Sequence, residues 1–281
     1  MLSGPRKSVT RIAADSHVNR ASAVARYLDW QRRRALNAFP FEQTLSASRV
    51  IAHGPSGVSA LIHVHGAYDH NNMSFLRILL APGLTFWDVG ANIGSYTLIA
   101  SQVSDATIVA FEPHPAMFEQ LRANVELNDR ANVQLEMVAI SDRTGALGFT
   151  DNASSSSVNR LTSDANAALR VAAMRADDMI ATGRAPRPDV LKIDVEGHEA
   201  GVLRGLGPAL KDVKVVFAED NAASRADVCR QLTAHGFIGP YCVDVTGRTL
   251  RATPSRYEDP VWIAAGFVDQ LTRSGYAISG T

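Results

Sequence analysis

Residues 84–112 read LTFWDVGANIGSYTLIASQVSDATIVAFE, and this stretch decides the fold class. An apolar run ends in Asp88 and is followed by a short turn that contains Gly90 and Gly94. A helix-compatible segment and a second apolar run come next, and the second run ends in Glu112. The order strand, glycine turn, helix, strand and acid predicts the first half of a doubly wound α/β sheet, which binds ligands at the carboxyl ends of its strands.

The spacing of the glycines indicates which cofactor this turn accepts. Dinucleotide sites use the pattern G-x-G-x-x-G, which brings the backbone close to a pyrophosphate. Here the turn reads DVGANIG, and Asp88 stands two positions before Gly90. The Asp88 carboxylate repels a pyrophosphate but attracts a ligand that carries an ammonium and a sulfonium group. Glu112, about 20 residues beyond the glycines, can accept hydrogen bonds from both hydroxyls of a ribose.

S-adenosylmethionine combines adenosine with a cationic methionine tail and has no phosphate, so it fits these residues. We expect Asp88, Gly90, Asn92, Gly94 and Glu112 to hold it. An ordinary β-to-α turn is the plain alternative, with glycines that serve only the backbone geometry. An NAD(P)-dependent oxidoreductase is another, which the missing third glycine disfavours. A cofactor-binding protein without catalytic activity is a third.

Four segments make the chain resemble the FkbM-type family of S-adenosylmethionine-dependent methyltransferases. They are FWDVGANIGSYTLIAS (86–101), VAFEPHPAMFEQLRANVELN (109–128), VAISDRTG (138–145) and VLKIDVEGHEAGVLRG (190–205). The resemblance covers about residues 70–267. It implies an α/β class I methyltransferase fold, in which helices cover both faces of a seven-stranded, mainly parallel sheet whose last strand is antiparallel. It also implies methyl transfer to an oxygen, commonly a sugar hydroxyl of a glycan, a glycolipid or a secondary metabolite.

The segment VLKIDVEGHE (190–199) supplies the catalytic candidates. It reads as an apolar strand that ends in polar groups, and in the implied fold this end faces the transferred methyl group. An alcohol is a poor nucleophile until its proton leaves, so a general base is expected there. His198 matches neutral pH best, although it is equally explained as a capping residue. Asp194 and Glu196 are alternatives, either as the base or as partners that orient the histidine or the acceptor.

A divalent metal is possible at the same sheet edge but is not favoured. Asp194 with Glu196, Glu219 or Asp220 could hold a hard ion that bridges the acceptor hydroxyls. Nothing in the sequence determines a coordination geometry, so action without a metal is the default. Asp194 is also expected among the cofactor-binding residues, and it shares a strand face with Lys192, with which it can form a buried pair.

A third strand is predicted over residues 133–141, with its end beside the adenine. Ala139 and Ile140 are expected to sandwich the base, and Ser141 or Asp142 to reach its polar edge. The plain alternative is that these residues form only core and a turn. Four serines follow at 154–157, where a solvated loop or a lid over the cofactor is expected.

The first part of the chain, residues 1–70, is predicted to be an addition to a methyltransferase domain over 71–281. Its first 34 residues carry eight lysines or arginines and two acids. We expect a loose basic arm of about twenty residues and then a packed cap helix over 23–36. A transit peptide is the alternative. The runs 48–53 and 59–65 predict a β-hairpin.

Three histidines in this region have a spacing that metal ligands can have. On an alternating strand, however, His63 and His65 mark the polar face, and His70 follows outside it. Metal binding by His63, His65 and His70 is therefore not favoured.

The composition indicates a globular protein with a large core. Of 281 residues, 46% are hydrophobic and the formal net charge is zero, so nothing favours nucleic-acid binding. The two cysteines, Cys229 and Cys242, suggest a reducing compartment. No apolar run is long enough to span a membrane. A cytoplasmic enzyme with a small-molecule or glycan acceptor is expected, and the oligomeric state is left open.

Overall fold

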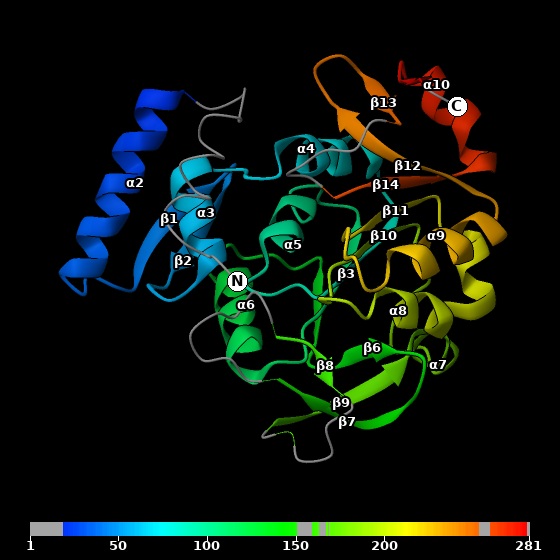
Figure 1. Ribbon diagram of the computed structural model, residues 1–281, viewed down its shortest axis with the longest axis horizontal. Coiled ribbons are helices and arrows are strands. Elements are labelled where there is room, and N and C mark those ends of the chain that lie inside the picture. The colour runs from blue at the N-terminus through cyan, green and yellow to red at the C-terminus, as the bar shows by residue number, and fades with distance from the viewer. Residues whose placement is uncertain (1–18, 151–158, 163–166, 168, 253–258, 280–281) are drawn as a thin grey trace.

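A computed structural model describes residues 19–150, 159–162, 167, 169–252 and 259–279. Within these residues, nine strands form a central sheet in the order β15-β13-β12-β14-β11-β10-β3-β4-β5. Helices cover both faces of this sheet, and the N-terminal elements lie beside it (Figure 1). The predicted basic arm and the serine run at 154–157 lie outside the described residues. No described helix has the length and apolarity needed to cross a bilayer.

One side of the sheet, up to its edge at β5, consists of five parallel strands. They are β5 (Val133–Glu136), β4 (Thr107–Phe111), β3 (Thr85–Val89), β10 (Val190–Ile193) and β11 (Val215–Ala218). Each strand in this order pairs in parallel with the next one. Every residue of β3, β10 and β11 is buried, as expected for strands that have helices on both sides.

Strand β14 (Val261–Ala264) runs antiparallel to both of its neighbours, β11 and β12 (Phe237–Asp244). The predicted seven-stranded, mainly parallel sheet with an antiparallel last strand is thereby confirmed. Two further strands, β13 (Thr249–Arg251) and β15 (Ala277–Ser279), extend its edge beyond β12. The sheet is therefore two strands wider than predicted.

The helices form two layers. One layer packs on the core that contains Phe75 and Phe86, and the other on the core that contains Trp87 and Leu203. The first layer consists of α4 (His70–Leu79), α5 (Ser95–Ala100) and α6 (Pro115–Leu127), and the second of α7 (Ala176–Ala181), α8 (Glu199–Leu206) and α9 (Arg225–Ala234). The short helix α10 (Val268–Arg273) and the 3-10 turns Gly207–Asp212 and Ala265–Phe267 complete the described helices.

A second, smaller sheet lies below the central one in Figure 1 and was not predicted. Its order is β6-β9-β7-β8, with β6 (Ala139–Ser141), β9 (Leu169–Arg175), β7 (Gly145–Phe149) and β8 (Leu161–Thr162). The prediction of one strand over 133–141 is therefore wrong. The chain leaves the central sheet after Glu136, whose carboxylate accepts a hydrogen bond from Arg184 Nε at 2.9 Å. Met137 is exposed, and the chain then joins β9.

The N-terminal elements confirm the cap helix and correct the hairpin. Helix α2 (Arg20–Ala35) begins three residues before the predicted helix, ends one residue before its end, and buries Trp30. The hairpin is formed by β1 (Phe41–Leu45) and β2 (Ser48–Ala52). Residues 59–65 belong instead to helix α3 (Gly57–His65).

The cap of α3 explains why residues 59–65 are helical, and the shortness of the apolar run explains why the prediction was wrong. The side chain of Ser56 caps α3 by accepting a hydrogen bond from Ser59 N at 3.1 Å. Short apolar runs such as this one fit the helical and the strand period equally well, so periodicity alone cannot separate them.

The correction also changes the environment of the histidines. His63 packs against Trp30 and Phe41, with ring centroids 5.5 and 5.4 Å away, and its Nε2 lies 3.2 Å from Asp29 Oδ2. His65 is buried. Neither residue lies on a strand, and His63 contributes to the packing of α2 against α3.

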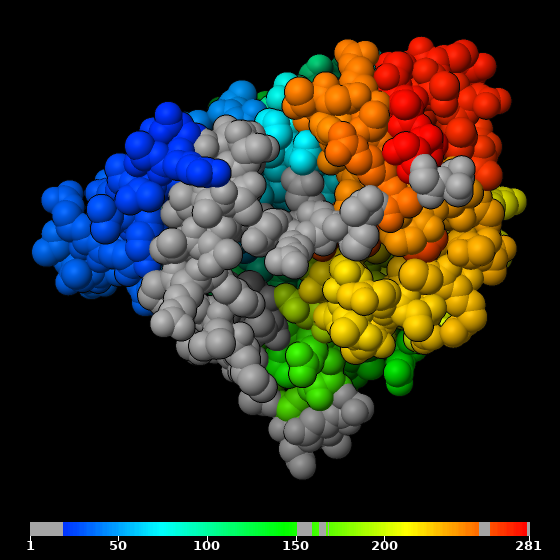
Figure 2. All heavy atoms as spheres, turned by 45° about the horizontal axis from the view of Figure 1, so that its top comes forward, coloured from blue at the N-terminus to red at the C-terminus, as the bar shows by residue number. Residues whose placement is uncertain are grey.

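The N-terminal elements contact the rest of the protein closely. Arg49 N donates to Asn128 Oδ1 at 2.7 Å, and Tyr68 Oη lies 2.8 Å from Ser95 Oγ. Figure 2 shows α2 and α10 at opposite ends of one face of the molecule. The division of the chain at residue 70 stays a prediction, because these contacts join the two parts.

Candidate functional site

A cavity of about 880 Å³, counted with its open mouth, lies at the carboxyl ends of β3, β4 and β10. Strand β3 has β4 on one side and β10 on the other, so the chain reverses its direction of winding here. Ligands of open α/β sheets bind at such a point. Most of the predicted site residues line the cavity, namely Asp88, Gly90, Asn92, Glu112, Ala139, Asp194 and Glu196.

Asp88 supplies a buried carboxylate to this cavity. Its Oδ2 accepts a hydrogen bond from Thr97 Oγ1 at 2.6 Å, whereas Oδ1 is buried without a hydrogen-bond partner among the described residues. Burial raises the pKa of Asp88, although the Lys192 ammonium opposes this shift. Burying an oxygen without a hydrogen-bond partner costs free energy. Asp88 Oδ1 is therefore suited to accept a hydrogen bond from a ligand.

Gly90 is required by a close approach of two backbone segments. Its φ is +85°, and a Cβ at this position would lie 1.9 Å from the carbonyl oxygen of Asp194. Gly94 begins α5 with a φ of +92°, and a Cβ there would lie 2.6 Å from Leu121 Cδ1. Gly94 does not line the cavity in the described residues, and it serves the packing of α5 on α6.

The substitution Gly90→Ala is expected to lower the free energy of unfolding by about 3 kcal/mol or more, because it adds a backbone clash to the cost of a positive φ. Gly83→Ala is the matched control. Gly83 has a φ of +81°, and a Cβ added to it would meet nothing within 4 Å. That variant should lose only about 1 kcal/mol. Urea denaturation measures both, and equal losses would mean that the close approach to Asp194 is unimportant.

Glu112 is held by two backbone amides. Its Oε2 accepts from Asn92 N at 2.8 Å and its Oε1 from His114 N at 2.9 Å. Burial raises the pKa of Glu112 to about 7, although both amide hydrogen bonds oppose the shift. A carboxylate has about four acceptor positions, so two remain for hydroxyl groups of a ligand.

The second sheet contributes an apolar wall to the cavity. Ala139 and Ile140 of β6 line it, as do Phe149 of β7 and Leu161 of β8. The loop before α4 and helix α3 add Tyr68 and Val58. Sequence reasoning missed Phe149, Leu161, Tyr68 and Val58 because no local pattern links these separate segments to the glycine turn.

Lys192 places a buried positive charge beside the cavity. Its Nζ lies 3.0 Å from Asp194 Oδ2 and 4.8 Å from the centre of the Tyr96 ring, which confirms the predicted Lys192–Asp194 pair. Burial by itself lowers the pKa of Lys192, but the carboxylates of Asp194 and Asp88 outweigh it and raise the pKa above its ordinary value. The ammonium therefore stays charged at neutral pH.

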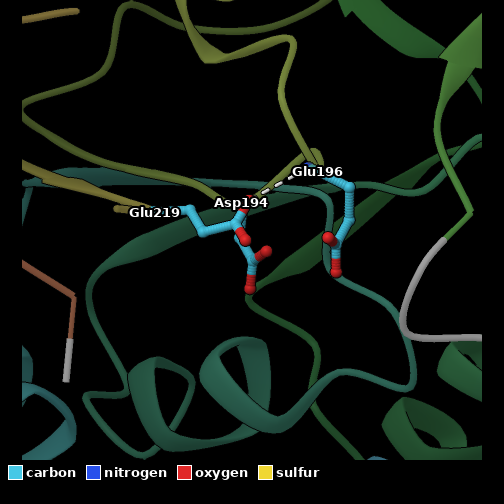
Figure 3. A group of neighbouring side chains, drawn as sticks. All are labelled: Asp194, Glu196 and Glu219. Carbon is cyan, nitrogen blue, oxygen red and sulfur yellow. Dashed lines mark hydrogen bonds between the residues drawn. The ribbon is translucent and has the colours of Figure 1, made fainter. Parts of the chain in front are cut away.

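Three carboxylates, two of which line the cavity, lie close together (Figure 3). Asp194 and Glu196 follow β10, Glu219 follows β11, and an oxygen of each lies within 4.8 Å of the others. Glu196 N donates to Glu219 Oε2 at 3.1 Å. Oxygens at this spacing could bind a divalent cation. Asp220, the other metal candidate, is paired with Arg225 instead, at 2.8 Å from its Nη2.

Crowding of the carboxylates changes how they titrate. Burial, followed by the charges of Asp194 and Glu199, raises the pKa of Glu196 to about 7. Burial, followed by the charges of Asp194 and Glu196, raises the pKa of Glu219 to about 9. At neutral pH Glu219 is therefore largely protonated, whereas Glu196 lies near the midpoint of its titration and can accept a proton.

His198 and Ser141 are brought together, but away from the cavity. His198 Nε2 lies 2.9 Å from Ser141 Oγ, and neither residue is among the described residues that line the cavity. Burial lowers the pKa of His198. A Cβ on Gly201 would lie 2.3 Å from His198 Nε2, so the ring packs against the first turn of α8. The hydrogen bond between His198 and Ser141 therefore links the start of α8 to the end of β6.

The substitution His198→Ala is expected to destabilise the protein by about 1 kcal/mol through loss of this hydrogen bond. Since the ring is outside the cavity, kcat for methyl transfer should stay within about threefold of wild type, far less than the 10²-fold or more that a general base supplies. Stopped-time assays measure kcat, and urea denaturation measures the free energy of unfolding. A 10²-fold fall in kcat with unchanged cofactor affinity would restore His198 as the base.

The strand order and the cavity at the carboxyl ends of β3, β4 and β10 define a class I methyltransferase fold. The family model of the FkbM methyltransferase domain matches residues 88–238, more than half of the chain. The chain belongs to this family.

Two relatives show how far the similarity extends. Hexuronic acid methyltransferase AglP of Haloferax volcanii is 32% identical over 137 residues, which are 48% of this chain and 55% of that protein. The 31-O-demethyl-FK506 methyltransferase FkbM of Streptomyces tacrolimicus is 29% identical over 193 residues, which are 56% of this chain and 74% of that protein. The chain thus spans about half the length of the archaeal relative that it matches.

Proposed function

We propose that the protein is an S-adenosylmethionine-dependent O-methyltransferase that acts on a hydroxyl group of a sugar. The observation that carries the proposal is the cavity that combines the Glu112 carboxylate with the buried Oδ1 of Asp88, an atom that has no hydrogen-bond partner in the described part of the chain. Family membership supports methyl transfer. The name of the archaeal relative, a hexuronic acid methyltransferase, supports a sugar acceptor.

The residues of the cavity fit the parts of this cofactor. Asp88 Oδ1 would accept a hydrogen bond from the ammonium of the methionine part, and Gly90 lines the cavity beside it. Glu112 would accept hydrogen bonds from the ribose hydroxyls. Ala139 and Phe149 would contact the adenine. A pyrophosphate would meet the carboxylates of Asp88 and Glu112, which disfavours a dinucleotide.

The carboxylate cluster would serve the acceptor. Bound S-adenosylmethionine supplies a methyl group on a positively charged sulfur. The acceptor oxygen would form a bond to this methyl carbon, and the carbon–sulfur bond would break with its electron pair left on sulfur. Glu196 takes the hydroxyl proton, because it lines the cavity and because its pKa of about 7 suits a base at neutral pH. Asp194, held by Lys192, orients the acceptor.

Calorimetry tests the cofactor and a transfer assay tests the reaction. We expect S-adenosylhomocysteine to bind with a micromolar Kd and NADH to show no heat of binding. Label from methyl-tritiated S-adenosylmethionine should then appear in members of a panel of hexosides. Binding of NADH would indicate an oxidoreductase. Binding of S-adenosylhomocysteine without transfer to any hexoside would favour a cofactor-binding protein without this activity.

A further inference from the structure

A second cavity, of about 780 Å³ with its open side included, lies at the carboxyl end of β11 between α9 and β12. Its wall is mostly apolar, with Val228 of α9, Pro240 and Tyr241 of β12, and Trp262 of β14. Both cysteines of the chain, Cys229 and Cys242, also line it. None of the predictions from sequence included this cavity.

The carboxylate cluster joins the second cavity to the first. Glu219 lines the second cavity, whereas Asp194 and Glu196 line the first. Oxygens of all three lie within 4.8 Å of one another. A ligand hydroxyl that binds Glu219 is therefore close to the carboxylates that line the cofactor cavity. The Asp194 side chain is 38% exposed and is therefore accessible to such a group.

The charges around this junction select against an anionic molecule. Glu219 and Asp220 stand at the edge of the second cavity, and the Arg225 guanidinium beside them is already paired with Asp220. Lys192 is likewise paired with Asp194, so a carboxylate of a ligand would find no unpaired lysine or arginine among the described residues that line the two cavities. Hydroxyl groups, in contrast, can donate hydrogen bonds to these carboxylates.

We propose that the second cavity binds the acceptor, and that the acceptor is a neutral hydroxyl compound with an apolar body. The apolar body packs between α9 and β12, and one hydroxyl reaches Glu219, which orients it toward Glu196 and the cofactor. This inference rests on the proposed function and adds the place and the charge class of the acceptor.

The two cysteines allow a direct test, because alkylation of Cys229 and Cys242 reports on occupancy of this cavity. The probes are 4-nitrophenyl glucoside and 4-nitrophenyl galactoside, each compared with the matching uronide, which differs only by a carboxylate. Alkylation by N-ethylmaleimide is followed at each cysteine by mass spectrometry, with and without S-adenosylhomocysteine. Cys229→Ser and Cys242→Ser identify the two signals.

We expect at least one neutral glycoside to slow alkylation of Cys229 about threefold or more at saturation, while its uronide has little effect. The variant Asp220→Asn, which removes the charged partner of Arg225 at similar volume, should reduce this difference between glycoside and uronide. Equal protection by both, protection by the uronides alone, or no protection by either neutral glycoside would overturn the proposal. Calorimetry with S-adenosylhomocysteine tests the cofactor site separately. Loss of protection with normal cofactor binding would contradict only this inference, whereas absence of cofactor binding would contradict the proposed function.

Discussion

Replacing Glu112 with glutamine is expected to weaken binding of S-adenosylhomocysteine by about 10²-fold. Each hydrogen bond from a ribose hydroxyl to a charged carboxylate contributes about 1.5–3 kcal/mol, and tenfold in Kd corresponds to about 1.4 kcal/mol. Glutamine keeps the size of the side chain but loses its charge and one acceptor oxygen. Calorimetry at pH 8 measures the effect.

The affinity of the wild-type protein should also depend on pH. Ribose hydroxyls bind the ionised form of Glu112, whose pKa in the ligand-free protein is about 7 because of burial. Affinity is therefore complete above this pH and falls as the pH drops through it, whereas the Glu112→Gln protein should lack this dependence. Asp142→Asn is the control, because Asp142 pairs with Arg204 and does not line the cavity in the described residues. A Glu112→Gln protein with wild-type affinity would exclude the ribose role.

Replacing Glu196 with glutamine is expected to lower kcat by about 10²- to 10⁴-fold, the usual contribution of a general base. In the wild-type protein, kcat should rise with pH through about 7, where the Glu196 carboxylate becomes ionised. The variant should lose this rise. Affinity for S-adenosylhomocysteine should change little, since the residue contacts the acceptor side. Initial rates from pH 5.5 to 8.5 measure the effect, which requires an acceptor found in the hexoside panel.

Stability provides the control for Glu196→Gln. Because the pKa of Glu196 is raised in the folded protein, its contribution to stability is present at acidic pH and is lost as the pH rises through about 7. The variant should therefore be at least as stable as wild type at pH 8, so a loss of kcat would not be due to unfolding. A variant that keeps kcat within about threefold and retains the rise with pH would exclude Glu196 as the base, since a base contributes far more.

Local sequence was sufficient for the cofactor side of the site. Asp88, Gly90 and Glu112 come from one continuous stretch of strand, turn, helix and strand, whose order is visible in the spacing of apolar residues and glycines. Parallel strands that follow one another in this way place their carboxyl ends together, so the proximity of these three residues follows from the sequence.

The acceptor side could be predicted only in part. Asp194 and Glu219 were expected at one sheet edge because each follows a buried strand, and the structure brings their oxygens within 4.8 Å. His198 is only four residues from Asp194 but contacts Ser141, because the loop after β10 turns at Glu196, with a φ of +54°. The direction of a side chain after such a turn depends on backbone angles that composition and spacing do not determine.

The sequence by itself determined the class of fold, the glycine turn and the two acids at the ends of β3 and β4, because these depend on contacts between residues close in the chain. Only the tertiary structure decided the second sheet, the helical state of residues 59–65 and the partner of His198. It also decided that Glu219, which lines the second cavity, lies within 4.8 Å of carboxylate oxygens of Asp194 and Glu196, which line the first. These features depend on pairing and packing between distant segments, whose free energies outweigh weak local preferences.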